Sequence, residues 1–229
     1  MHIAVVIPTW NEAQSIGRVL ADIPRPPVTE IIVVDRDSRD GTREIAAAAG
    51  ARIIVEPRRG YGRACRTGLE AAAFADIVVF LDGDYSDRPA ELPALLEPIV
   101  SGRADIVIGS RLAGPRAQGA LPAHSLFGNW LAARLIRLLY GVPLTDLGPF
   151  RAGRAEVLRA LNLREDTYGW AVEMILRGAL RRVRIAEVPV SYHPRIGTSK
   201  ITGTVRGSLG AGWYILGRIF TYRLFQGET

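Results

Sequence analysis

Apolar runs and amphipathic segments alternate through the first half of the chain. The apolar runs predict strands at residues 3–7, 30–34, 51–55, 76–81 and 105–109. The segments between them carry helix start and stop signals and predict helices at 12–23, 40–49, 63–74 and 89–100. Buried parallel strands read as continuous apolar runs, and helices connect them across the sheet. The order therefore predicts an α/β fold with a mainly parallel central sheet flanked by helices on both faces.

The second half of the chain has a more helical pattern. Helices are predicted at 125–140, 153–161, 169–180 and 209–225. Residues 183–192 predict one or two strands, and loops are expected at 145–152 and 193–204, where Gly, Pro and Thr interrupt the pattern. No linker and no internal repeat separates the two halves, so we expect a single domain over 1–229.

Composition narrows the class of protein. The chain has 229 residues, 48% of them apolar, and a net charge of +6, which argues against disorder. Every basic residue except Lys200 is Arg, and the Arg residues form no basic tail or stripe, so we expect no nucleic-acid partner. Cys65 is the only cysteine and the histidines are scattered, so neither a disulfide framework nor a zinc site is expected.

Two long apolar segments raise the question of a membrane. Neither 126–140 nor 209–225 reaches the about 18 uncharged residues of a spanning helix, because Arg interrupts both. The chain starts directly in a strand-like run, so we expect no secretory leader and a cytoplasmic location. Trp130, Arg134 and Arg137 share one helical arc, which suits peripheral contact with the inner face of the membrane or an ordinary surface helix. For the last segment, 209–225, three alternatives stay open. It lies against a membrane surface, packs against the rest of the second half of the chain, or packs against a second subunit in a homodimer.

Two carboxylates follow the apolar run 76–81. Asp82 and Asp84 are separated only by Gly83, at the edge where open α/β sheets place ligands. Acids this close repel each other unless a positive charge lies between them. A divalent cation bound to a diphosphate fits, because magnesium takes one or two carboxylates together with substrate phosphates. The alternative is a polar turn with two solvated acids.

Several segments, taken together, resemble the family-2 glycosyltransferases of the GT-A fold. The most similar branch is that of the dolichyl-phosphate mannosyltransferases and their bacterial relatives. The matching segments follow the order of the family: VVIPTWNE at 5–12, VVDRDSRDGT at 33–42, GYGRACRTGL at 60–69, FLDGDYSD at 80–87, IGSR at 108–111, TDLGPFR at 145–151 and VPVSYHPRIGTSK at 188–200. Together they span residues 5 to 200, so the resemblance covers most of the chain.

The resemblance implies an inverting, metal-dependent transferase. Such an enzyme moves a sugar from a nucleotide diphosphate sugar to an acceptor with the help of Mg²⁺ or Mn²⁺. The acceptor expected here is a polyprenyl phosphate; the alternatives are a soluble hydroxyl acceptor or a non-catalytic sugar-nucleotide binder. A nucleotide-sugar-binding half is expected over about 1–111 and an acceptor half over about 112–229.

The matching positions supply the candidate site. The cation ligands are Asp82 and Asp84. The donor-binding candidates are Pro8, Thr9, Asn11, Glu12, Asp35, Gly60, Arg63, Asp82, Gly83, Arg111 and Ser199. The catalytic candidates are Asp146, Arg195 and Lys200. Lys200 also stands out by composition, since a single Lys among many Arg suggests a need for a compact ammonium beside the leaving diphosphate.

Two positions depart from the family pattern, and one role is ambiguous. Arg36 stands where the family has a second acid, which leaves the nucleotide open. Ser86 stands where this branch often has a metal-binding Gln, which leaves the number of metal ligands open. A hydroxyl acceptor would need a base, and Asp146 and Glu173 are both candidates. A phosphate acceptor is already ionised, and Asp146 would then orient a sugar hydroxyl or a cation.

Overall fold

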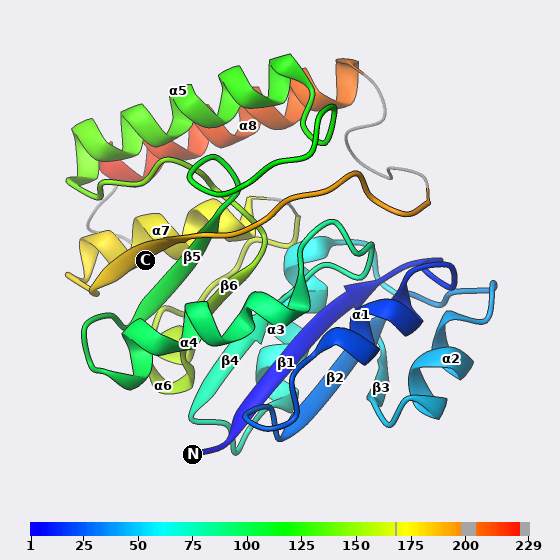
Figure 1. The fold of residues 1–229 in the computed structure, drawn as a ribbon. Helices are drawn as coiled ribbons and strands as arrows, with labels where there is room; N and C mark the ends of the chain where they lie inside the picture. The colour runs from blue at the N-terminus through cyan, green and yellow to red at the C-terminus, as the bar shows by residue number, and fades with distance from the viewer. Residues whose placement is uncertain (168, 198–204, 225–229) are drawn as a thin grey trace.

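The computed structural model describes residues 1–167, 169–197 and 205–224, of which 205–211, 213 and 224 are described by backbone alone. It is an α/β structure in which helices cover both faces of one sheet (Figure 1). The strands are β1 (Ile3–Thr9), β2 (Glu30–Asp35), β3 (Arg52–Val55), β4 (Ile77–Phe80), β5 (Ile106–Ser110), β6 (Arg151–Arg154) and β7 (Ile185–Pro189). The α-helices are α1 (Ile16–Asp22), α2 (Thr42–Ala48), α3 (Tyr61–Ala71), α4 (Leu92–Val100), α5 (Ala123–Tyr140), α6 (Ala155–Ala160), α7 (Trp170–Leu180) and α8 (Val205–Leu224).

The sheet order is β3-β2-β1-β4-β6-β5-β7. β1 pairs in parallel with β2 and β4, and β5 pairs in parallel with β7. The predicted mainly parallel sheet is thereby confirmed. β6 is the exception: it runs antiparallel to both β4 and β5 and joins the two parallel groups. Strands from before and after residue 111 thus belong to one sheet.

β6 was not predicted as a strand. Its sequence, RAGR, contains no apolar run, and the Gly/Pro-rich segment before it predicted a loop. Backbone pairing on both sides makes it a strand, with Ala152 opposite Val79 and also opposite Val107. A central strand buried in this way needs no apolar run of its own, because hydrogen bonds to both neighbours satisfy its backbone.

Alternate residues of β1 face two separate apolar cores. Ile3, Val5 and Ile7 lie in a core with α1, α2 and α4, whereas Ala4 and Val6 lie in a core with α3, α6 and α7. A period of two residues places successive side chains on opposite faces of a sheet. Both faces are covered, which is why the strands read as unbroken apolar runs.

A third apolar core joins Ile108 of β5 to three helices. Ala132 and Ile136 of α5 pack there with Val172 and Ile175 of α7 and with Ile219 of α8. α5 and α8 lie side by side over α7 (Figure 1). Within the described part of the chain, no helix has the length and hydropathy needed to cross a bilayer.

The first helix begins later than predicted. Asn11 was expected to cap a helix from residue 12, but α1 begins at Ile16. Asn11 has a φ of +53°, and its side-chain oxygen accepts a hydrogen bond from the backbone N–H of Arg39 at 3.0 Å. Its amide therefore ties the loop after β1 to the loop after β2.

Candidate active site

Asp84 lies at the carboxyl edge of the sheet, four residues after β4 ends. The residue is 6% exposed. Oδ1 accepts hydrogen bonds from the backbone N–H of Ser86 at 2.9 Å and from Ser86 Oγ at 2.6 Å. Ser86 thus orients the second acid of the Asp-x-Asp pair, a role that its place in the sequence did not reveal. Oδ2 faces away from Ser86, toward Arg195.

Arg195 reaches this carboxylate from a segment more than a hundred residues away. Its Nη2 lies 3.1 Å from Asp84 Oδ2 and 3.5 Å from Glu12 Oε1. The segment is held in place by its backbone, because the N–H of Ile196 donates to the carbonyl of Asp84 at 2.9 Å. The structure therefore brings together Glu12, Asp84 and Arg195, three of the residues predicted for the site.

Gly83 allows the ends of β1 and β4 to approach each other. A Cβ at this position would lie 3.0 Å from Thr9 Cγ2. The Gly83 carbonyl accepts a hydrogen bond at 2.8 Å from Ser15 Oγ, which also lies 3.3 Å from Glu12 Oε2. The loop after β1 and the Asp-x-Asp loop are therefore packed as one unit, with Glu12 between them.

The carboxylates create a strongly negative region. Burial and the neighbouring charge of Asp84 raise the pKa of Asp82 to about 7. Asp87 is 1% exposed, and neither of its carboxylate oxygens has a hydrogen-bond partner among the described residues. Burial, with the charge of Asp82 as the next cause, raises its pKa well above the usual range. Asp87 was not among the residues predicted for the site, although it ends the DGDYSD motif.

These residues fit a divalent cation that is shared with a phosphate ligand. Within the described ranges, no three His, Cys, Asp or Glu side chains cluster as a cation cage. Magnesium does not require one, since it is commonly held by one or two carboxylates and by substrate phosphates. Asp82 and Asp84 meet that requirement, and the orphaned carboxylate of Asp87 adds negative charge nearby.

Asp146 and Arg111 form a closed pair beside this region. Arg111 Nε and Nη2 donate to the two carboxylate oxygens of Asp146 at 2.7 and 2.8 Å, and its backbone N–H donates at 2.9 Å. Asp146 is fully buried. Burial alone would raise the pKa of Asp146, but the hydrogen bonds from Arg111 outweigh it and lower that pKa. Asp146 is therefore an ionised anchor for Arg111, whose guanidinium also lies over the ring of Tyr192.

Glu173 is not a cleft residue, contrary to the prediction that α7 presents it as a base. It is 1% exposed. Its Oε2 accepts hydrogen bonds from the backbone N–H groups of Arg164 and Glu165, and its Oε1 accepts from Arg177 Nε and from the hydroxyl of Tyr222. These contacts join α7 to α8 and to the loop before α7. Glu173 is a structural carboxylate.

Arg151, the last residue of the TDLGPFR segment, is structural as well. It is 1% exposed and donates to the carbonyls of Ala171 at 2.7 Å and of Leu147 at 3.2 Å. It also donates to the carbonyl of Gly148. Arg151 therefore fixes the segment that carries Asp146 against α7.

Asp35, a predicted donor-binding residue, is the last residue of β2. Its carboxylate is fully buried and accepts hydrogen bonds from Thr9 Oγ1 at 2.9 Å, from the Ser38 N–H at 2.8 Å and from Ser38 Oγ at 2.6 Å. Asp35 thus closes the loop after β2 onto the end of β1. Contact of Asp35 with the donor stays a prediction.

Gly60 and Arg63 both contact the segment that contains Asp166. A Cβ at Gly60 would lie 2.1 Å from the backbone oxygen of Asp166, and Arg63 pairs with the Asp166 carboxylate. The glycine is therefore required by close packing, and its φ of +146° adds to that requirement. The predicted roles of Ser199 and Lys200 fall outside the described residues.

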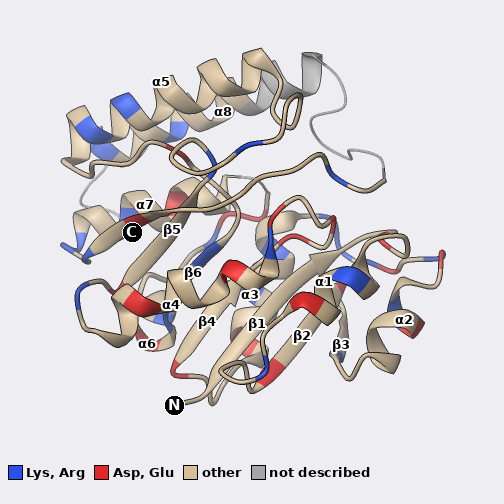
Figure 2. Ribbon diagram, viewed as in Figure 1, with Lys and Arg blue, Asp and Glu red and all other residues tan. Residues whose placement is uncertain are grey.

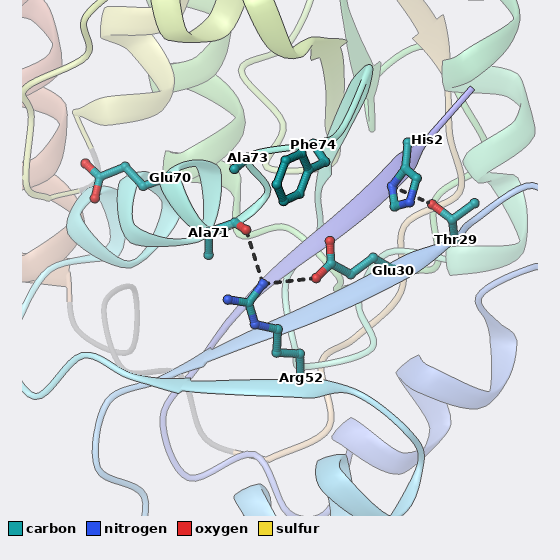
Figure 3. A pocket seen from close by; sticks show the side chains of 8 residues that line it. All are labelled: His2, Thr29, Glu30, Arg52, Glu70, Ala71, Ala73 and Phe74. Atoms are coloured by element: carbon teal, nitrogen blue, oxygen red, sulfur yellow. Dashed lines mark hydrogen bonds and ion pairs between the residues drawn. The ribbon is translucent and has the colours of Figure 1, made fainter.

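A separate cavity of about 620 Å³ lies at the opposite edge of the sheet. Figure 3 shows its lining, in which Arg52 donates to Glu30 and to the carbonyl of Ala71, and His2 lies beside Thr29. It sits at the amino ends of β1, β2 and β3, so it is remote from the Asp-x-Asp loop at their carboxyl edge.

Comparison with known proteins agrees with this geometry. The family model described as "Glycosyl transferase family 2" matches residues 4–161. A dolichyl-phosphate hexose transferase of Haloferax volcanii is 38% identical over 205 residues, which cover 87% of this chain and 86% of that protein. An undecaprenyl-phosphate mannosyltransferase of Micrococcus luteus is 35% identical over 223 residues and 90% of both chains.

The solved structures give the same family. Glucosyl-3-phosphoglycerate synthase from Mycobacterium tuberculosis, in complex with Mn²⁺, UDP and glucosyl-3-phosphoglycerate, has a TM-score of 0.74 and 26% identity. The alignment covers 97% of this chain and 79% of the synthase. The resemblance inferred from the sequence motifs is confirmed, and so is the α/β fold of GT-A type. The chain belongs to glycosyl transferase family 2.

Proposed function

We propose that the protein catalyses inverting, metal-dependent transfer of a sugar from a nucleotide diphosphate sugar to a polyprenyl phosphate. The convergence of Asp84, Glu12 and Arg195 at the carboxyl edge of the sheet carries this proposal. It puts two acids and a cation of the chain where a donor diphosphate and its cation would bind. Mn²⁺ or Mg²⁺ accompanies UDP in complexes of the structurally similar synthase.

The reaction is a single in-line displacement. An oxygen of the acceptor attacks the anomeric carbon as the bond from that carbon to the diphosphate oxygen breaks, which inverts the configuration. When bound, the cation held by Asp82 and Asp84 neutralises charge on the diphosphate. Arg195 and Lys200 are proposed to donate hydrogen bonds to the leaving diphosphate, where they stabilise charge that grows in the transition state.

The contacts of Asp146 and Glu173, the two predicted bases, favour an acceptor that does not need a general base. Asp146 is bound bidentately by Arg111, and Glu173 accepts four hydrogen bonds in the interior. A hydroxyl acceptor must lose a proton to a base within hydrogen-bond reach. A phosphate acceptor is already ionised at neutral pH. In this proposal Asp146 holds the Arg111 guanidinium toward an anionic group.

An exposed stripe on α5 supports a lipid-borne acceptor. Its members are the exposed residues Phe127, Trp130, Arg134, Arg137 and Leu138. They fall within one arc of the helix, and α5 contains no Asp or Glu (Figure 2). Aromatic and apolar side chains mixed with Arg suit the interface of an anionic bilayer. We therefore propose peripheral contact with a membrane, in keeping with the lipid-phosphate substrates in the names of two relatives.

Transfer to a soluble acceptor is the second candidate. Its support is the likeness to glucosyl-3-phosphoglycerate synthase, whose complexes contain a phosphoglycerate. Both acceptors carry a phosphate. The difference is the attacking oxygen, which belongs to the phosphate in the first case and to a hydroxyl in the second.

A transfer assay separates the two. The purified protein is incubated with Mn²⁺, labelled nucleotide sugars and either a short polyprenyl phosphate or 3-phosphoglycerate. The proposal expects an acid-labile lipid product of inverted anomeric configuration, as read by NMR, and loss of product with EDTA. Asp84→Asn is the inactive control, and Arg103→Ala, an exposed position distant from the site, is the matched active one. Transfer to 3-phosphoglycerate alone supports the second candidate, and retention of configuration contradicts the mechanism.

A further inference from the structure

Arg36 and Trp10 form a stacked pair at the carboxyl edge of the sheet. The Arg36 guanidinium carbon lies 4.2 Å from the centre of the Trp10 ring. Trp10 directly follows β1 and Arg36 directly follows β2, and the Arg36 N–H donates to the carbonyl of Thr9 at 2.9 Å. Trp10 is 37% exposed and Arg36 is half-buried. The pair therefore flanks the edge at which α/β sheets bind nucleotides.

The guanidinium of Arg36 is free to bind a ligand. Among the described residues, its side chain makes the ring contact with Trp10 and no hydrogen bond or ion pair. The acids nearest in sequence are engaged elsewhere: Asp35 with Thr9 and Ser38, and Asp37 with Arg43. Stacking on an aromatic ring holds the planar guanidinium while its N–H groups remain available at the edge.

The end of β2 therefore offers donors in place of acceptors. A base N–H requires an acceptor, but the carboxylate of Asp35 is fully buried and already accepts three hydrogen bonds. Arg36, with the fork of donors, stands where the sequence pattern of the family has a further acid. A base recognised here must present acceptors to the fork.

Guanine meets this requirement better than adenine or uracil does. Its O6 and N7 are adjacent acceptors that match a guanidinium fork, whereas adenine places an N–H₂ donor beside N7. Each of the two carbonyls of uracil stands next to the N3–H donor, so uracil can accept from only one arm of the fork at a time.

We propose that Arg36, held by Trp10, selects a guanine nucleotide by donating to O6 and N7, so that the sugar donor is a guanosine diphosphate sugar. This specificity rests on the proposed function, because it concerns the donor of that reaction. It sets this chain apart from the structurally similar synthase, whose complexes contain UDP.

Binding of GDP, ADP and UDP with Mn²⁺ tests the inference, with dissociation constants measured by isothermal titration calorimetry. We expect GDP to bind about tenfold or more tightly than either other nucleotide, as for one bidentate guanine contact. Arg36→Ala should remove most of that preference and leave UDP binding almost unchanged. Arg36→Lys should also lose it, because a point charge replaces the fork.

Two further variants complete the design. Trp10→Ala should weaken GDP more than UDP, and Trp10→Phe should retain most of the preference by keeping a ring. Arg39→Ala is the matched control, an exposed Arg three positions along, and should bind all three nucleotides as the wild type does. Circular dichroism verifies that each variant is folded.

The outcomes separate this inference from the proposed function. Equal binding of GDP and UDP, or a GDP preference that survives in Arg36→Ala, overturns the guanine assignment while the transferase proposal stands. Tight binding of both GDP and ADP overturns it as well, because stacking alone would then account for the affinity. Failure to bind any nucleotide, with transfer absent, overturns both.

Discussion

Arg195 Nη2 lies 3.1 Å from Asp84 Oδ2, and the same nitrogen lies 3.5 Å from Glu12 Oε1. A cation of the chain itself thus neutralises two of the acids at the sheet edge. Arg195 and a divalent cation would both be drawn to Asp84, so the two positive charges should compete for it. Donor binding supplies the diphosphate as an alternative partner for Arg195.

Replacement of Arg195 should therefore affect metal and turnover in opposite directions. Arg195→Ala removes the competing charge and should raise the affinity for Mn²⁺ in the absence of donor, as measured by electron paramagnetic resonance. The same variant should lower kcat, because the leaving diphosphate loses a donor. In Arg195→Lys, both the Mn²⁺ affinity and kcat should lie between those of Arg195→Ala and of the wild type. Weaker Mn²⁺ binding in Arg195→Ala would show that the guanidinium does not occupy the cation's place.

Asp84 should be indispensable to metal binding. Asp84→Asn keeps the size of the side chain but removes the charge, so we expect loss of Mn²⁺ binding and of nearly all transfer. Ser86→Ala removes the hydroxyl hydrogen bond to Asp84 Oδ1 but keeps the one from the backbone N–H, so it should cause a smaller loss. Full activity of Asp84→Asn, or activity that EDTA leaves intact, would contradict a metal site here.

We expect Asp146→Asn to show that Asp146 anchors Arg111 and does not act as a general base. Breaking a buried ion pair by removal of one partner costs about 3–5 kcal/mol, so urea denaturation should show a clear loss of stability. The residual activity should keep the wild-type dependence of kcat on pH, because no proton passes through Asp146. Loss of the basic limb of that profile, with stability unchanged, would assign Asp146 as a general base.

Asp87 predicts a dependence of stability on pH. The charged groups that face it are Asp82, Arg111, Asp84 and Asp146. Because its folded-state pKa is raised above the value of 3.8 for a free Asp, the folded state favours the protonated acid. The contribution of Asp87 to the free energy of unfolding is therefore fully present below pH 3.8. It is lost as the pH rises toward the folded-state pKa of Asp87.

Asp87→Asn should remove that loss. Relative to the wild type, the free energy of unfolding of the variant should increase between pH 5 and pH 8, as measured by urea denaturation without metal. Asp105→Asn is a suitable control, because hydrogen bonds from Arg184 lower the pKa of Asp105 and its contribution is therefore constant over this range. An unchanged difference between Asp87→Asn and the wild type at the two pH values would mean that Asp87 is ionised throughout.

Lys200 should contribute to the chemical step. If it stabilises the leaving diphosphate, Lys200→Ala should raise the barrier by about 2–4 kcal/mol, with a smaller effect on donor KM. Lys200→Arg should recover only part, since a planar fork does not replace a compact ammonium. Steady-state kinetics of the two variants provide the measurement, and an unchanged kcat in Lys200→Ala would remove this residue from the mechanism.

Local pattern was enough to locate most strands and the candidate metal acids. The apolar runs that became β1, β2, β4 and β5 are buried on both faces, so burial leaves its mark on every residue of each run. Asp82 and Asp84 could be placed because strand polarity puts the residues after a parallel strand at the ligand-binding edge. The order of the motifs was enough to indicate the family.

Only the tertiary structure decided which charges are free. Arg111 and Asp146, or Asp84 and Arg195, are far apart in the chain, and no periodicity records that they meet. β6 owes its conformation to neighbours on both sides, and Glu173 is structural because α8 and the loop before α7 supply donors to it. Hydrogen bonds and ion pairs depend on a few tenths of an ångström between specific atoms, which chain packing sets and residue type alone does not.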